Sequence, residues 1–236
     1  MKLDEAFARL NVVVDLIPRS LSNRPGTAMH PTFITIHNTA NNSPDADALM
    51  HARYLKGDDA RRRKVSWHFS MDDTRCVKHL PTNEVAWHAG PANTQSIAIE
   101  VCQNQGINKA EAISRASLLT AVLMSFYNIN ADHVVPHKFW TGKDCPEVIL
   151  REPGGFDAFR RQAQDFLMQL SQSDEAVERA VSEIVDPLPP LEDVSEDRGL
   201  PPVSGTLEER VAQLEQIIAQ IASDHVALQN QTYEAD

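Results

Sequence analysis

The stretch SIAIEVC, residues 96–102, constrains the fold more than any other part of this chain. It is apolar at almost every position, which is typical of a central strand buried on both faces. A sheet whose middle strand is buried on both faces needs helices on each side. We therefore expect an α/β fold with a mixed central β-sheet flanked by helices.

Other segments predict further strands of this sheet. Residues 33–38, FITIHN, alternate β-forming side chains and end in polar residues. This pattern is typical of a strand whose last residues emerge at the edge of the sheet. The segments VSWHFSM and CVKHLP lie on either side of residues 72–75, DDTR, and predict a β-hairpin.

Three helices are predicted in the same region. Ser43 is suited to the N-cap of the first, with Pro44 at the first helical position and apolar residues following at helical spacing. The second covers 109–127 and is rich in Ala and Leu, and the third is marked by apolar residues from Phe156 to Leu170. We expect this domain to span residues 1–170.

Charge separates the rest of the 236-residue chain from this domain. Residues 1–170 hold 19 Lys and Arg against 18 Asp and Glu, whereas residues 171–236 hold 3 against 15. Residues 171–205 also carry five of the 14 prolines, which predicts an acidic, Pro-rich linker. Residues 206–230 repeat apolar side chains at steps of four and three, which predicts an amphipathic helix. Homo-oligomerisation through a coiled coil and docking onto residues 1–170 both stay open.

Composition excludes some classes of partner. The acidic tail does not suit nucleic acid, and the one basic cluster, RRRK at 61–64, is interpreted as a solvated loop. No stretch approaches the roughly 18 apolar residues of a membrane span. The N-terminal segment has no secretory hydrophobic region, so we expect the product to accumulate in the cytosol. We expect neither nucleic acid nor a membrane as a partner.

The segment VVPHKFWTGKDCPEVIL, residues 134–150, brings chemistry-bearing side chains close together. It is too rich in Gly, Thr, Asp and Pro to be expected as a helix. His137 and Cys145 lie eight residues apart across a loop that contains Gly, and His37 at the end of the first predicted strand is the best third ligand. Two His and one Cys leave the fourth tetrahedral position of Zn²⁺ for water, as a catalytic site requires. Cys76 and Cys102 lie in apolar runs and are interpreted as small buried hydrophobes.

Five segments in matching order, over roughly residues 15–168, resemble the zinc-dependent N-acetylmuramoyl-L-alanine amidases. They are NRPGTAMHPTFITIHNTANNSPDADALMHARYL, VSWHFSMDD, EVAWHAG, SIAIEVC and VVPHKFWTGKDCP. Within this family the chain is most similar to Bacillus-type cell-wall hydrolases and phage endolysins, relatives of phage T7 lysozyme and the peptidoglycan recognition proteins. The resemblance implies that fold, a peptidoglycan substrate and Zn²⁺ as cofactor.

The resemblance also implies roles for individual residues. His37, His137 and Cys145 match the family's zinc ligands, Glu100 its catalytic carboxylate, and Lys143 the lysine two residues before the third ligand. Zinc lowers the pKa of bound water towards about 7. Glu100 is then expected to move a proton from that water to the departing amine, and Lys143 to stabilise the charge on the carbonyl oxygen.

One position departs from the family pattern. Some relatives have a catalytic Tyr where this chain has Trp67, whose indole N–H cannot accept a proton. We therefore expect the carboxylate to carry the proton transfer, and Trp67 to serve in packing or as a groove wall. His68, Trp87 and His88 are candidates for lining the substrate groove, with core packing as the alternative for Trp87.

The expected function is hydrolysis of the bond between N-acetylmuramic acid and L-alanine of the stem peptide, as in an endolysin or autolysin. A cytosolic amidase that recycles soluble muropeptides and a peptidoglycan-binding module without turnover are the alternatives. Cys145 disfavours the binding module, because recognition proteins of this superfamily typically lack the third ligand.

Overall fold

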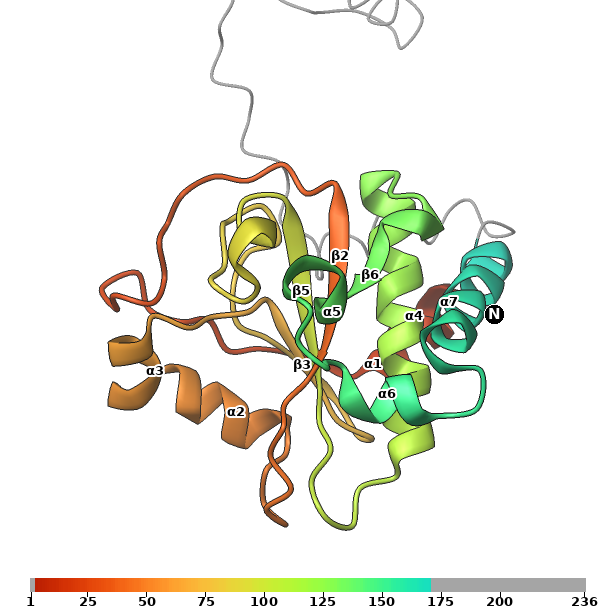
Figure 1. Cartoon of the computed structure of the whole chain (residues 1–236), viewed down its shortest axis with the longest axis horizontal. Coiled ribbons are helices and arrows are strands. Elements are labelled where there is room, and N and C mark those ends of the chain that lie inside the picture. Colours follow the sequence, from red (N-terminus) through yellow and green to blue (C-terminus); the bar gives the residue numbers. More distant parts are fainter. Residues whose placement is uncertain (1–2, 171–236) are drawn as a thin grey trace, which may run out of the picture. The chain divides into compact units, whose positions relative to one another are not determined.

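The computed structural model describes residues 3–170, which form a six-stranded sheet between helices (Figure 1). The strands are β1 (Val12–Val14), β2 (Phe33–Asn38), β3 (Phe69–Met71), β4 (Cys76–Lys78), β5 (Ser96–Val101) and β6 (Val134–Pro136). The α-helices are α1 (Leu3–Leu10), α2 (Ala48–Leu55), α3 (Asp58–Arg63), α4 (Lys109–Tyr127), α5 (His137–Thr141), α6 (Glu147–Arg151) and α7 (Gly155–Leu170). Two 3-10 helices cover Gly90–Ala92 and Ala131–His133. The predicted linker 171–205 and helix 206–230 lie outside the described residues.

The sheet is mixed, with strand order β1-β4-β3-β5-β2-β6. Among these six described strands, only β3 and β4 pair antiparallel, and they form the predicted hairpin. The other neighbouring strands run parallel, including β5, β2 and β6, which lie side by side. The expected mixed α/β sheet is thereby confirmed, and the buried run at 96–102 supplies β5, the third strand from one edge.

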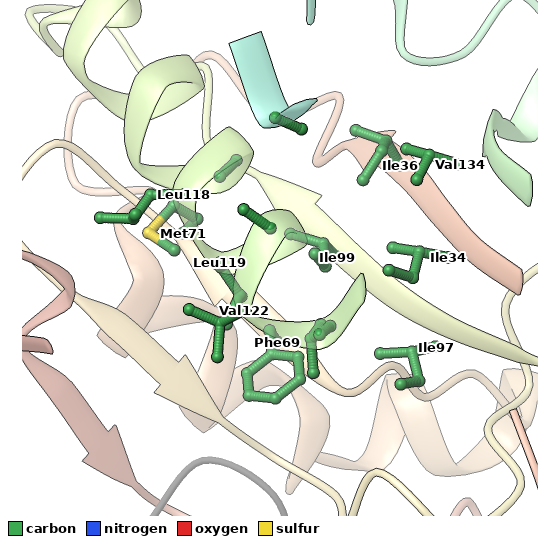
Figure 2. Packing of buried hydrophobic residues seen from close by; sticks show 14 of the residues in the cluster. Ile34, Ile36, Phe69, Met71, Ile97, Ile99, Leu118, Leu119, Val122 and Val134 are labelled. Atoms are coloured by element: carbon green, nitrogen blue, oxygen red, sulfur yellow. The ribbon is translucent and has the colours of Figure 1, made fainter. Parts of the chain in front are cut away.

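Alternation along β2 and β5 divides the sheet into two unlike faces. Ile34, Ile36, Ile97 and Ile99 point to one face, where they meet Leu118, Leu119 and Val122 of α4 (Figure 2). Helix α7 packs against the outer side of α4, whereas α2 and α3 lie on the opposite side of the sheet (Figure 1). On that second face Ala98 packs with Leu55 and Trp67. The same face of β2 and β5 also carries the polar side chains of Thr35, His37, Ser96 and Glu100. One face is therefore the main core, and the other is available for a polar site.

The capping residues explain where the longest helix begins and ends. The Asn108 side chain accepts the backbone N–H of Glu111, which satisfies one of the free donors at the start of α4. Asn128 ends the helix in the left-handed conformation, with φ of 52°. The prediction of a helix over 109–127 is confirmed.

Helix α2 begins later than the sequence predicted. Its N-cap is Asp47, whose carboxylate accepts the backbone N–H of Met50, and Asp72 from the hairpin turn accepts that of Ala48. The prediction of Ser43 as N-cap was wrong, because these two carboxylates cap the first turn instead. Ser43 forms a tight turn with Ala46.

Two segments expected as loops contain short helices. Residues 61–63 of the basic cluster belong to α3, where each Arg forms an ion pair with Asp58 or Asp59 one turn earlier. Residues 137–151 include α5 and α6, because Gly142 ends α5 at φ of 76° and Pro146 lies just before α6. Gly and Pro thus stand at the ends of these helices and do not prevent them.

Within residues 3–170, no helix combines the length and apolar character that crossing a bilayer requires.

The segment that leads to Trp87 and His88 is fixed by a buried ion pair. Arg24 donates from Nε and Nη2 to Glu84 at 2.7 and 2.6 Å, and from Nη1 to the Ile17 carbonyl at 2.7 Å. Both side chains are buried, with 6% and 10% of their surface exposed. The backbone of Glu84 also pairs with Ala28, which ties the segment before β2 to the segment before β5.

Replacing one member of this pair should destabilise the protein strongly. Arg24→Leu leaves a buried carboxylate without its main partner, so the free energy of unfolding should fall by about 3–5 kcal/mol. The double variant Arg24→Leu/Glu84→Leu should recover at least half of that loss, because no uncompensated charge remains. Urea denaturation measures both. Arg62→Leu breaks an exposed ion pair with Asp59 and should cost far less stability than Arg24→Leu; equal losses for the two variants would contradict the assignment.

Candidate metal centre

The candidate site lies where three neighbouring parallel strands end. In the pairing of β2 with β5, His37 lies opposite Glu100, so both side chains point to the polar face of the sheet. In the pairing of β2 with β6, Ile36 lies opposite Pro136, which places His137 next to His37. The carboxyl ends of parallel strands are where open α/β sheets bind ligands.

Helix α5 and the turn after it bring Cys145 to the same place. The backbone N–H of Lys138 donates to the Cys145 carbonyl at 2.9 Å, which closes the loop between the two ligand residues. Asn38, next to His37, accepts the N–H groups of Val148 and Ile149 and donates to the Val101 carbonyl at 3.1 Å. Asn38 therefore connects β2, β5 and the first turn of α6.

The predicted ligands His37, His137 and Cys145 converge. Their ligand atoms lie within 4.8 Å of one another, and no other group of three or more such side chains was found in residues 3–170. All three side chains are buried, and the Cys145 Sγ lies 3.8 Å from His37 Nδ1. The Nδ1 atom of His137 has no hydrogen-bond partner among the described residues.

This donor set fits Zn²⁺. Two imidazoles and one thiolate are ligands that zinc prefers, and three protein ligands leave a tetrahedral position for water. A buried imidazole nitrogen without a hydrogen-bond partner costs free energy that coordination of a metal would offset.

Burial keeps the ligand groups neutral without a metal. It lowers the pKa of His37 well below its usual value, with further lowering from His88, His137 and Lys143. It also lowers the pKa of His137, and Lys143 adds to that effect. Burial raises the pKa of the Cys145 thiol to about 11. A metal bound here would therefore have to displace the thiol proton.

Glu100 lies beside the ligands without being hydrogen-bonded to them. Its Oε1 is 3.8 Å from His37 Nδ1, its Oε2 has no hydrogen-bond partner among the described residues, and 14% of the side chain is exposed. Burial raises its pKa to about 8, against the opposing charge of Lys143. A carboxyl group with a pKa near neutrality can both accept and return a proton.

A cavity of about 450 Å³ opens in front of these residues. Glu100, Lys143, Trp87 and His88 line it together with the three ligands, and the Lys143 side chain is exposed on its wall. Trp67 also lines the cavity and donates its indole N–H to Ser70 at 2.8 Å, so it serves both in packing and as a wall.

His68 was a candidate for lining the substrate groove, but it is not among the residues that line this cavity. Its side chain is fully buried. Its Nε2 pairs with the Glu84 carbonyl at 2.8 Å, and its Nδ1 accepts the Ala98 N–H at 3.0 Å. The ring therefore connects β5 to the segment before Trp87.

Several cavity residues were not found from the sequence. Met50, His51 and Tyr54 of α2 face the cavity, and Arg63 and Asn41 complete its outer part. The Tyr54 ring stacks on Trp67, with centroids 6.1 Å apart. The usable signal was the spacing of these α2 residues, since positions 50, 51 and 54 share one side of a helix.

Fold and site together define a class of protein, and comparison with known families identifies it. The model of the N-acetylmuramoyl-L-alanine amidase family matches residues 27–148, more than half of the chain. The chain belongs to this family, which confirms the resemblance seen in its sequence motifs. All three candidate ligands and Glu100 lie within the matched range.

Relatives with high sequence identity are bacterial amidases. XlyA of Bacillus subtilis (strain 168) is 47% identical over 153 residues, which are 63% of this chain and 50% of the relative. CwlH of the same organism is 46% identical over 141 residues, which are 58% of this chain and 55% of the relative. The chain thus spans about half the length of the curated relatives it matches.

Solved structures agree with the fold. The catalytic domain of XlyA matches with a TM-score of 0.61 at 46% identity, covering 65% of this chain and 99% of that domain. PlyL matches with a TM-score of 0.55 at 29% identity, covering 65% of this chain and 96% of that chain. The described region is therefore similar to a whole catalytic domain.

Removing the Asn38 side chain should destabilise the segment that carries Cys145 and the start of α6. Asn38→Ala deletes the acceptor for two N–H groups at the start of α6 and the donor to Val101, so we expect about 2 kcal/mol less stability in urea denaturation. The control is Gln164→Ala, which removes an exposed amide from α7 and should change stability by less than about 0.5 kcal/mol. If the two variants were equally stable, Asn38 would not have the connecting role assigned to it.

The buried Glu100 should make the metal-free protein less stable as the pH rises. Its pKa is about 8 in the folded chain against an ordinary value of 4.5, so its contribution is fully present below pH 4.5 and is lost as the pH rises through 8. Glu100→Gln should remove this dependence and be more stable than wild type at pH 9, by on the order of 3–5 kcal/mol. Urea denaturation with a chelator from pH 5 to 9 measures it; parallel pH profiles would contradict the buried, protonated state.

Proposed function

We propose that this chain hydrolyses the amide bond between the lactyl group of N-acetylmuramic acid and L-alanine in peptidoglycan, with zinc held by His37, His137 and Cys145. The convergence of these ligands with Glu100 at one cavity, in a chain of the amidase family, carries the proposal. XlyA and CwlH bear the same activity in their names, which supports it.

Bound zinc would supply a water molecule of lowered pKa and polarise the scissile carbonyl. Glu100 accepts the proton of the attacking water and delivers it to the alanine nitrogen as the carbon–nitrogen bond breaks, leaving a carboxylate and a free amino terminus. The pKa of Glu100 is about 8 without a metal, and a bound cation would lower it, so that the carboxylate is available to accept a proton at neutral pH.

Four further side chains of the cavity act on the substrate. The Lys143 ammonium lies on the cavity wall, where it stabilises negative charge that develops on the carbonyl oxygen. The Trp87 and Trp67 rings and Tyr54 give the cavity aromatic walls that suit the apolar faces of a sugar or peptide.

Activity on intact wall distinguishes this function from the alternatives. An endolysin or autolysin acts on sacculi, a recycling amidase prefers soluble muropeptides, and a binding module releases no product from either. Accumulation in the cytosol before release and self-association through residues 206–230 stay predictions from the sequence.

The test measures new L-alanine amino termini released from purified sacculi by the full chain. Chelation should abolish release and added Zn²⁺ should restore it, while Glu100→Gln should lower the rate by about 10²–10⁴-fold, because it removes the proton carrier. Glu152→Gln, which neutralises an exposed carboxylate after α6, serves as the matched control and should keep wild-type activity. Binding to sacculi without release, or release that survives chelation, would refute the proposal.

A further inference from the structure

The two ring nitrogens of His37 face different partners. Nδ1 points to the ligand cluster, 3.8 Å from both the Cys145 Sγ and the Glu100 Oε1. Nε2 lies 3.0 Å from Nδ1 of His88, within hydrogen-bond distance. The two rings meet edge to face, with centroids 5.1 Å apart and planes at 82°.

The position of His88 is fixed by its own backbone. The N–H groups of His88 and Ala89 both donate to the Asn93 Oδ1, at 2.9 and 3.0 Å. In the sequence, the 3-10 helix Gly90–Ala92 lies between these donors and their acceptor. The resulting turn places the His88 imidazole beside His37, at the end of β2. Asn93 thus holds the backbone of His88 and of the residue after it, while the His88 imidazole lies beside His37.

The chemistry of imidazole determines how the two rings share the proton. A neutral imidazole carries one N–H, and a nitrogen that binds a metal must be free of hydrogen. If Nδ1 of His37 is the ligand atom, its Nε2 carries the hydrogen and needs an acceptor. Glu100 cannot be that acceptor, because its nearest oxygen is on the Nδ1 side. Nδ1 of His88 is the atom in place.

We propose that His88 is a positioning residue of the metal centre, which accepts the Nε2–H of His37 and so fixes both the tautomer and the orientation of this ligand. This inference rests on the proposed function, since it assumes that His37 binds a metal. This role is additional to the place of His88 in the cavity lining, for which the sequence made it a candidate. The hydrogen on His88 then lies on its Nε2.

Zinc affinity tests the role directly and does not depend on turnover. His88→Ala removes the acceptor and should weaken Zn²⁺ binding by about 10–100-fold, the usual effect of losing the partner of a ligand histidine. His88→Asn should stay within about threefold of wild type, because its Oδ1 reaches the position of the imidazole Nδ1. His133→Ala removes an exposed imidazole outside the cavity and should not change affinity. Competition with a chromophoric chelator gives the constants, and the visible spectrum of the Co²⁺ form should change for His88→Ala alone.

A measurement on the wild-type chain guards against misfolding of a variant. Long-range ¹⁵N–¹H correlation spectra of the zinc-bound protein should show His37 with hydrogen on Nε2 and none on Nδ1. The opposite tautomer would overturn the inference, as would unchanged zinc affinity and Co²⁺ spectrum in folded His88→Ala. A wild-type chain that binds no zinc would instead refute the proposed metal centre itself, which keeps the two failures distinct.

Discussion

The parallel register of β2 and β5 is the constraint on which the site depends. Pairing His37 with Glu100 places both on the same face of the pleat and leaves Ile36 and Ile99 on the other. Because side chains alternate with a period of two, a slip of β2 by one residue would turn His37 into the core and Ile36 into the cavity. The packing of the four isoleucines into the core that also contains the α4 side chains therefore also specifies this register (Figure 2). Core and site are two consequences of one pairing.

Polar side chains outside the strands then fix the positions of the loops and turns, which the strand register does not determine. Asn38 holds the start of α6 behind Cys145, Asn93 holds the turn of His88, and the Arg24–Glu84 pair holds the segment before Trp87. Each is a side chain that satisfies backbone or charged groups which would otherwise be buried without partners. The precision of a site built from loops comes from such bonds, since loops have no regular ladder of their own.

The sequence predicted what depends on regular pattern. The strand at 96–102, the hairpin around residues 72–75 and the helix at 109–127 follow from apolar periodicity. The convergence of His37, His137 and Cys145 follows from motif spacing and resemblance, and their role as metal ligands stays a prediction. Prediction from the sequence failed where contacts between distant residues determine the local structure. The start of α2 depends on Asp72, a residue 24 positions away, and helices of five residues are too short to show a period. His68 could not be placed because a histidine beside a strand looks the same in sequence whether it faces a cavity or bonds to a backbone.

Without a metal, the ionisable groups of the cavity are held in their uncharged forms, and this has a cost in stability. Burial lowers the pKa of His37 and of His137, keeps the Cys145 thiol protonated and raises the pKa of Glu100 to about 8, so these four groups carry little charge at neutral pH. Such groups stay buried at a cost in stability, which is common at functional sites. A divalent cation bound to His37, His137 and Cys145 would favour the thiolate and the ionised carboxylate together, so metal binding would be coupled to the loss of protons from Cys145 and Glu100. The acceptor proposed for His37 Nε2 would favour the tautomer in which the nitrogen that faces the cluster is free of hydrogen and so able to bind the cation.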